Sequence, residues 1–500
     1  MEQLLDDVLV LVMQHLSVED LLACRLVCRR LGELALHRDA WRHRRIDDAK
    51  PCACAVLNLA PCLRELVYSD KVHPWAFLTT RCAVEQLVLQ MSSKDYNFSK
   101  YALLIRNQEA LGRLRRIEIW ASDLLGSVGS GYMEAERKAS GADMLLKTLV
   151  TCSDLESLDV RFGTVAFSSF LSYGSHRPSL KYFRCTLDAD SDSFARVVLA
   201  RHADTLEEVD LGSGYCNEVK QSIALLPSLP RLRKLSCEVV AGVEAAAGCK
   251  ALSDLTLVMD LDEPSEHPVA LLQQARQLRR VTLEFKDPVD NLYEDDGDSK
   301  VVAALVSPGP SLVEFLSVSR LKGVQALTAA LPRLPALRHL VVLHSPRRRN
   351  YFGDHPDDSD DSDDLDDLQD LHDLLLGVTA GTAPALRTLE LDLRPRTPTL
   401  FYRGTPERME CAHLWLHAYA VEAVLQDNPS LHVRLRMAFR CGAEDCAACV
   451  LDCHPELSWD GVSSSTAPVG LTAHERDRCP SPRDHPADGS IKWIQVRVAP

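Results

Sequence analysis

The chain has 500 residues, of which 46% are hydrophobic and 25% are charged, and its net charge is −15. This composition is typical of globular protein, and the length favours a small module plus one longer array over a single domain. Eleven aspartates between Asp354 and Asp373 supply most of the negative charge, since removing them from −15 leaves −4. The near balance elsewhere gives no electrostatic reason to expect a nucleic-acid partner.

The N-terminus has no features of a secretion signal or a membrane span. Glu2, Asp6 and Asp7 stand where a signal peptide would be basic, and no run approaches the ~20 apolar residues of a transmembrane helix. Seventeen cysteines occur without paired spacings, mostly at apolar positions. We therefore expect reduced cysteines in a cytoplasmic and/or nuclear protein with no membrane partner.

The first 47 residues predict a small helical module. The segment Leu16-Ser17-Val18-Glu19-Asp20-Leu21 is a helix-start signal, with Ser17 as N-cap and Asp20 three residues later. The helix before it is apolar almost all round from Val8 to Met13, so it is expected to be covered on more than one side. A tiny bundle covers only one side, which predicts a docking face for another protein.

The order of these residues resembles the F-box family. The matching pieces are Leu16-Ser17-x-x-Asp20-Leu21-Leu22, the Val27-Cys28-Arg29-Arg30 stretch and Asp39-x-Trp41. The resemblance implies a three-helix module over residues 1–47 that binds the SKP-family adaptor of a ubiquitin ligase and, through it, a cullin. The adaptor-binding residues it implies are Leu5, Val8, Leu9, Val12, Leu16, Leu21, Leu22, Val27, Cys28 and Trp41.

Two departures from the family pattern bear on adaptor affinity. The usual Leu-Pro opening is Leu4-Leu5 here, and the Trp that commonly follows the Cys-Arg pair is Leu31. The alternative reading is an ordinary helical hairpin that caps the next domain, because a solenoid needs such a cap.

A phrase of the form L-x-x-L-x-L recurs after residue 47. Its copies begin at residues 63, 84, 114, 155, 180, 206, 232, 252, 278, 312, 337 and 386. The clearest spacings of 25 and 26 residues lie within the ~20–29 of leucine-rich repeats. Each copy predicts one short strand with apolar side chains inward, and stacked copies form one sheet.

Helical segments are expected between these strands. They are residues 101–111, 144–150, 194–202, 219–226, 269–278, 301–306 and 324–331. The chain therefore resembles the F-box leucine-rich-repeat family, with an irregular α/β strand–helix solenoid over 48–440. Residues 431–435 and 491–498 are further strand candidates, and 441–500 form a Cys-rich segment and loose tail.

An acidic insertion is expected near residues 347–373. Its first part, Asp354–Asp364, has almost no apolar residue, whereas leucines return at helical spacing from Leu365 to Leu375. A tolerated solvent loop is the favoured interpretation. The alternative is a charged arm that contacts a basic cargo.

The outward face of the repeat strands is expected to bind a protein cargo. Exposed aromatic and arginine side chains are frequent interface anchors, which nominates Trp120, Arg161, Phe162 and Arg184. Alternatively, Trp120 and Phe162 pack under adjacent loops.

One C-terminal cluster has metal-like spacing: Cys441, Cys446, Cys449, Cys453 and His454. Four thiolates and an imidazole would satisfy zinc. However, Cys446, Cys449 and Cys453 also share one helix face, where small apolar residues pack, so metal is not favoured and no cofactor is expected.

No catalytic motif is present, which predicts a non-enzymatic chain. Two functions remain. The first is the substrate receptor of an SKP–cullin–F-box ubiquitin ligase, which holds an unidentified protein near a recruited conjugating enzyme. The second is a leucine-rich-repeat scaffold whose F-box is degenerate.

Overall fold

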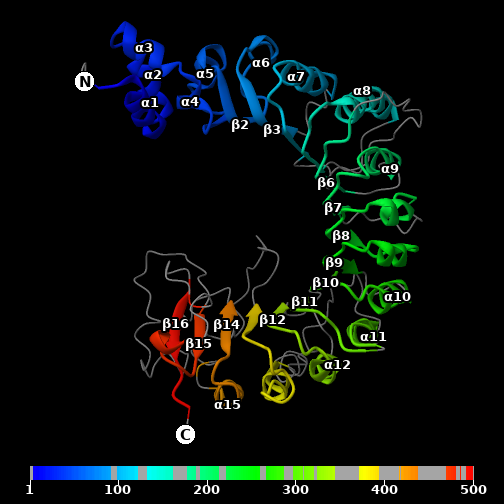
Figure 1. Ribbon diagram of the computed structural model, residues 1–500. Helices are drawn as coiled ribbons and strands as arrows, with labels where there is room; N and C mark the ends of the chain where they lie inside the picture. Colours follow the sequence, from blue (N-terminus) through cyan, green and yellow to red (C-terminus); the bar gives the residue numbers. More distant parts are fainter. Residues whose placement is uncertain are drawn as a thin grey trace, which may run out of the picture. The chain divides into compact units, whose positions relative to one another are not determined.

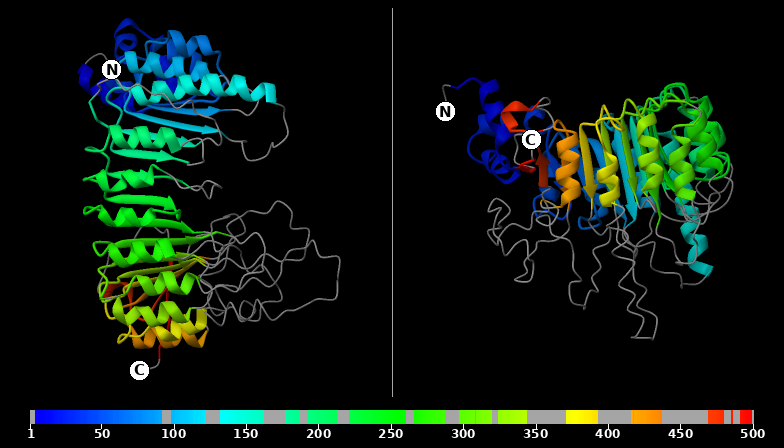
Figure 2. Two further views of the ribbon diagram at one scale, coloured as in Figure 1. Left: turned by 90° about the vertical axis from the view of Figure 1, so that its right-hand side faces the viewer. Right: turned by 90° about the horizontal axis from the view of Figure 1, so that it is seen from below.

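The computed structural model describes residues 4–91, 98–121, 132–161, 177–186, 192–212, 221–259, 266–286, 297–307, 309–319, 324–343, 371–392, 416, 418–436, 469–479, 485 and 491–498. The chain divides into two compact units, Met1–Leu252 and Ser253–Pro500. In each unit the strands lie in sequence order, with helices stacked along one side of the sheet (Figures 1 and 2). This is the α/β strand–helix repeat that the leucine phrases predict.

Four helices form the N-terminal module: α1 (Asp6–His15), α2 (Val18–Cys24), α3 (Arg29–Ala35) and α4 (Arg38–Trp41). The predicted cap of α2 is confirmed, because the Asp20 amide donates to Ser17 Oγ at 3.0 Å. The prediction of three helices missed α4, a single helical turn that contains the Asp39-x-Trp41 motif. Trp41 is fully buried, and its Nε1 donates to the Ala35 carbonyl at 2.7 Å.

Arg44 joins the module to the sheet. Its guanidinium donates to the carbonyls of Ala40, Leu16 and Met13 at 2.7–2.8 Å. The last two lie at the C-terminal end of α1, where carbonyls lack helical partners and a cation is favourable. The next residue already begins β1 (Arg45–Asp47), which pairs in parallel with β2, so the end of the predicted module belongs to the sheet.

The first unit contains strands β1 to β8, and each pair is parallel. After β1 they are β2 (Cys62–Tyr68), β3 (Ala83–Met91), β4 (Arg116–Ala121), β5 (Ser157–Arg161), β6 (Tyr182–Cys185), β7 (Glu208–Asp210) and β8 (Lys234–Glu238). The helices between them are α5 (Ala53–Leu59), α6 (Pro74–Thr79), α7 (Phe98–Ala110), α8 (Tyr132–Thr151), α9 (Asp192–Arg201) and η1 (Ile223–Ser228), and η2 (Val243–Gly248) follows β8.

The second unit contains strands β9 to β16. They are β9 (Asp254–Met259), β10 (Arg280–Phe285), β11 (Phe315–Ser319), β12 (His339–Leu343), β13 (Thr388–Asp392), β14 (His432–Arg436), β15 (Val469–Thr472) and β16 (Lys492–Gln495). β15 is antiparallel to β14, whereas the other pairs are parallel. Helical segments are α10 (Glu266–Gln274), α11 (Gly297–Ala304), α12 (Gln325–Ala330), η3 (Leu331–Arg333), residues 371–377, α15 (Tyr419–Asp427) and η5 (Arg476–Arg478).

The repeat phrase sets the strand register. The second apolar position of each phrase pairs with the same position of the next strand, in the series Leu66, Leu87, Ile117, Leu158, Phe183, Val209 and Leu235. These side chains are buried, because alternate residues of a strand point to one face and here that face meets the helices. All twelve phrases coincide with β2 to β13, and the strands expected near 431–435 and 491–498 are confirmed as β14 and β16.

The predicted helices appear with shifted ends, and one changes type. Where residues 219–226 predicted an α-helix, the described part is the 3₁₀ helix η1, which contains Pro227. Proline lacks the N–H that an α-helix requires, and its ring clashes with the preceding turn. Among the described residues, no helix combines the length and the apolar character needed to cross a membrane.

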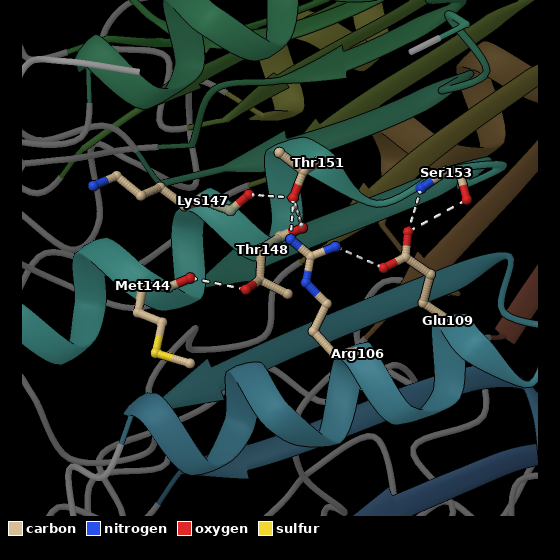
Figure 3. Close-up of polar contacts among 7 residues, drawn as sticks. All are labelled: Arg106, Glu109, Met144, Lys147, Thr148, Thr151 and Ser153. Atoms are coloured by element: carbon tan, nitrogen blue, oxygen red, sulfur yellow. Dashed lines mark hydrogen bonds and ion pairs between the residues drawn. The ribbon is translucent and has the colours of Figure 1, made fainter. Parts of the chain in front are cut away.

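A polar clasp fixes α8 against α7 in the long interval between the third and fourth repeats (Figure 3). Arg106 of α7 donates to Thr151 Oγ1 at the end of α8 and pairs with Glu109 at 2.8 Å. Glu109 in turn accepts from the amide of Ser153 at 2.8 Å. The described part of this interval is mainly α8, which contains the segment 144–150 that was predicted to be helical.

Buried cysteines of the repeats behave as small apolar groups. Burial raises the pKa of Cys82 and Cys152 to about 12 and that of Cys249 to about 11, so these side chains stay as neutral thiols. The acidic insertion lies outside the described residues except for 371–373, where Leu371 is buried at the start of a helical segment.

Candidate functional site

The N-terminal module has an exposed apolar surface. Seven of the fourteen exposed large hydrophobic side chains among the described residues lie within the first 27 positions: Leu4, Leu5, Val8, Leu11, Val12, Leu26 and Val27. Leu26 and Val27 are 84% and 68% exposed, and Leu5 is 73% exposed. We call these seven residues the apolar face. Such a concentration on one small module is typical of a protein interaction site.

Helical spacing places five of these residues along one side of α1 and its start. Leu4, Val8 and Leu11 follow steps of four and three, and Leu5, Val8 and Val12 do the same. The opposite side of α1 carries Leu9, Val10 and Met13, which are buried against the rest of the module. The sequence predicted this division: a helix apolar all round is covered by its own module on one side only.

Arg30 connects the two parts of the apolar face. It lies at the start of α3 and donates from Nε to Asp6 Oδ1 at 2.9 Å, and its Nη2 donates to the carbonyl of Leu4. The turn that carries Leu26 and Val27 is therefore held at the end of the module where α1 begins.

The structure divides the ten predicted adaptor-binding residues into three groups. Leu5, Val8, Val12, Val27 and Cys28 are exposed, and Leu16 and Leu22 are half-buried. Leu9, Leu21 and Trp41 are at most 4% exposed, because they fill the core of the module. The assignment of these three to the contact surface is therefore corrected: they support the face from behind. The exposed Leu4, Leu11 and Leu26 were missed, although helical spacing indicated the first two.

A second candidate surface is an open hollow over β3 to β6, on the sheet face away from the helices. Its volume is about 490 Å³. Its lining is Gln86, Arg116, Glu118, Glu156, Ser157, Asp159, Arg161, Lys181 and Tyr182. Three of these residues are basic and three are acidic, so the hollow favours neither sign of charge. Mixed charge suits a protein segment better than a nucleic-acid backbone.

Two of the four predicted cargo residues lie on this face as ion pairs. Arg161 donates to both carboxylate oxygens of Asp159 at 2.5–3.1 Å, and Arg184 pairs with Asp210 of the next strand at 3.2 Å. Trp120 is 40% exposed, and the guanidinium of Arg161 lies 5.7 Å from its ring centre. The structure thus brings Trp120 and Arg161 together. Phe162 lies outside the described residues.

Burial and charge shift two pKa values in the hollow. The hydrogen bonds from Arg161 to Asp159 raise the pKa of Arg161, so its guanidinium stays charged. Desolvation, followed by the carboxylates of Asp159 and Asp210, raises the pKa of Tyr182. Tyr182 therefore presents a neutral hydroxyl and an aromatic ring next to charged groups, a combination common in protein interfaces.

A different set of residues gathers at the C-terminal end of the second unit. One ligand atom from each of His432, His474, Cys479 and His485 lies within 4.8 Å of the others. The set was missed because its members are 42, 5 and 6 residues apart and no local spacing connects them. The sequence instead singled out Cys441, Cys446, Cys449, Cys453 and His454, which lie outside the described residues.

Comparison with known proteins identifies the module. A family model described as F-box-like matches residues 3–47. A search of curated proteins found no match. Among solved structures, a TLR13–ssRNA13 complex matches with a TM-score of 0.34 and 13% identity, over 70% of this chain and 45% of that one. A Rad7 and Elc1 complex in yeast matches with a TM-score of 0.32 and 14% identity, over 78% and 81%. Scores this low support no functional argument. What the comparisons do establish is that the chain carries an F-box-like domain at residues 3–47.

Proposed function

We propose that the chain is the substrate receptor of an SKP–cullin–F-box ubiquitin ligase, acting in the cytoplasm and/or nucleus. The observation that carries the proposal is the exposed apolar face on a module that matches the F-box-like model. An SKP-family adaptor docks on this face, and a cullin joins through the adaptor. Buried Leu9, Leu21 and Trp41 keep the face in shape, so adaptor contact falls to the exposed residues.

Cargo binds the outward face of the repeat strands. The hollow over β3 to β6 is lined by the aromatic ring of Tyr182 and by charged groups of both signs, and the parallel strands fix its shape. A rigid surface of this kind loses little entropy on binding. The receptor contributes proximity: it raises the effective concentration of cargo lysines near a conjugating enzyme, and bond making belongs to that enzyme.

The experiment is co-purification of the full chain with an SKP-family adaptor and a cullin. The double variant Leu26→Glu/Val27→Glu places two charges on the apolar face, and Leu312→Glu is the control because Leu312 is also exposed, at 56%, but lies in the second unit. We expect wild type and control to retain both partners and the double variant to lose them. If none of the three chains retained the adaptor and the cullin, the result would favour the alternative function, a scaffold with a degenerate F-box.

The proposed cargo site in the hollow is tested separately. A photo-reactive amino acid at Lys181, which lines the hollow, should cross-link a cellular protein. The same group at Trp75, an exposed residue of α6 away from the hollow, is the control. Cross-links from the control position alone would contradict the placement of the cargo site.

A further inference from the structure

The C-terminal end of the second unit contains a compact cluster of nitrogen and sulfur ligands. His432 starts β14, His474 follows β15, Cys479 follows η5, and His485 lies before β16. His432 is fully buried, His485 and Cys479 are 4% and 9% exposed, and His474 is half-buried. The ring of Trp493 stacks on His485 at a centroid distance of 4.3 Å and an interplanar angle of 13°, which shields this side of the cluster from solvent.

Backbone carbonyls orient two of the three imidazoles. His432 Nδ1 lies 3.1 Å from the carbonyl of Arg387, and His474 Nδ1 lies 2.8 Å from the carbonyl of Pro429. A carbonyl only accepts, so each Nδ1 carries the proton and each Nε2 has a lone pair. This is the arrangement by which metal-binding histidines are usually held.

The lone pairs converge on the inside of the cluster. His432 Nε2 lies 3.3 Å from Cys479 Sγ. His474 Nε2 is buried and has no hydrogen-bond partner among the described residues. A buried acceptor without a partner is destabilising, so a lone pair that points into the cluster calls for an electron-poor ligand. A metal cation satisfies this requirement.

Zinc fits the donors best. Three imidazoles and one thiolate supply four nitrogen and sulfur ligands, the donor types and the number that Zn²⁺ takes in a closed tetrahedral site. Bond lengths of about 2.0–2.3 Å in a tetrahedron put ligand atoms about 3.3–3.8 Å apart. The 3.3 Å between His432 and Cys479 matches this range, and the widest separation of 4.8 Å exceeds it by about 1 Å, which side-chain rotation closes.

We propose that His432, His474, Cys479 and His485 bind one Zn²⁺ ion that fastens β15 and β16 to β14. The position explains the role. β15 is paired with β14 through three residues only, and β16 through β15, so these short strands have little intrinsic hold on the sheet (Figure 1). Repeat arrays need a terminal cap, and sheet edges need protection. A metal that links β14 to the segments after β15 and before β16 supplies the cap.

Gly470 supports the same assembly. A Cβ at Gly470 would overlap the Trp493 ring, so only glycine lets the ring pack flat on β15 and reach His485. The proposed zinc site departs from the expectation of no cofactor, and its ligands differ from the Cys441–His454 cluster that the sequence singled out.

The test is metal content of the full chain purified with Zn²⁺ and then freed of loosely bound metal. We expect about one zinc ion per chain in wild type and less than about a tenth of that in Cys479→Ser and His474→Ala. Cys249→Ser is the control for a buried thiol, and a variant with serine at Cys441, Cys446, Cys449 and Cys453 should also keep its zinc. Zinc-free wild type, or zinc retained by Cys479→Ser, would overturn the proposal.

Two further measurements separate metal binding from misfolding. His474→Cys preserves a ligand at the half-buried position and should keep the zinc that His474→Ala loses. In wild type, chelation should speed amide hydrogen exchange in β15 and β16 and leave β9 and β10 unchanged. Equal zinc content in both His474 variants would contradict the proposed site. So would hydrogen-exchange rates in β15 and β16 that do not change when the chelator is added.

Discussion

The helical module and the repeat strands present opposite kinds of surface. The apolar face of the module consists of leucines and valines that are 39–84% exposed, with Leu26 the most exposed of them. The open face of β4 to β7 carries charged groups that neutralise one another, as Arg161 does with Asp159 and Arg184 with Asp210. The first surface gains free energy only when a partner covers it, whereas the second is stable in water. An obligate partner is therefore expected on the module and an exchangeable one on the strands.

The largest expected effect comes from the module's core. Trp41→Ala removes a fully buried ring and its hydrogen bond to Ala35, which should lower the free energy of unfolding of the module by about 3–5 kcal/mol. Hydrogen exchange resolved by segment measures it. Faster exchange should be confined to α1 to α4, and a uniform effect through β2 to β8 would show that the module and repeats unfold together.

Acid should weaken the repeats before the module. His202 is buried behind the strands, its Nδ1 accepts from the amides of Ser179 and Leu180, and burial followed by the charge of Arg201 lowers its pKa from 6.5 to about 4. The unfolded chain takes up this proton first, so stability falls as the pH drops from about 6.5 to 4, by up to about 3 kcal/mol.

The matched variant for this pH effect is His202→Asn, whose side-chain oxygen can accept the same amides. Its unfolding free energy should lose the part of the acid dependence that His202 contributes. The module's own histidines, His15, His37 and His43, are all exposed, and hydrogen exchange in α1 to α4 is the reference for this measurement. An unchanged pH profile in His202→Asn would contradict the assignment.

The smallest effect tests the self-neutralised strand face. Asp159→Asn leaves Arg161 without its counter-charge and should cost about 1 kcal/mol, because Asp159 is 5% exposed but Arg161 is 41% exposed and reaches water. Glu208→Gln is the control: its pair with Lys234 is exposed on both sides and should matter less than about 0.5 kcal/mol. Denaturant titration measures both losses of unfolding free energy. Equal losses for Asp159→Asn and Glu208→Gln would contradict the distinction between the buried and the exposed ion pair.

The parts of the fold that could be predicted from the sequence are those that depend on local residue patterns. The Ser17 cap, the repeat strands and even the weak strand near 491–498 depend on residues a few positions apart, and each is confirmed. Burial on α1 was less predictable, since Leu9 and Val8 are equally apolar neighbours and only the packing of α3 and α4 decides that Leu9 faces inward. The His432–His485 cluster could not be read from spacing, because the sheet brings together residues that are far apart in the chain.

The most direct test of the central claim is a calorimetric titration of the full chain with a purified SKP-family adaptor. Val8→Glu changes one exposed residue of the apolar face, and Leu103→Glu changes an exposed leucine of α7 in the same unit. We predict that Val8→Glu weakens binding about 100-fold, equivalent to about 2.7 kcal/mol, and that Leu103→Glu binds like wild type. Equal affinity for all three proteins, or no binding by wild type, would contradict the claim that this face docks the adaptor.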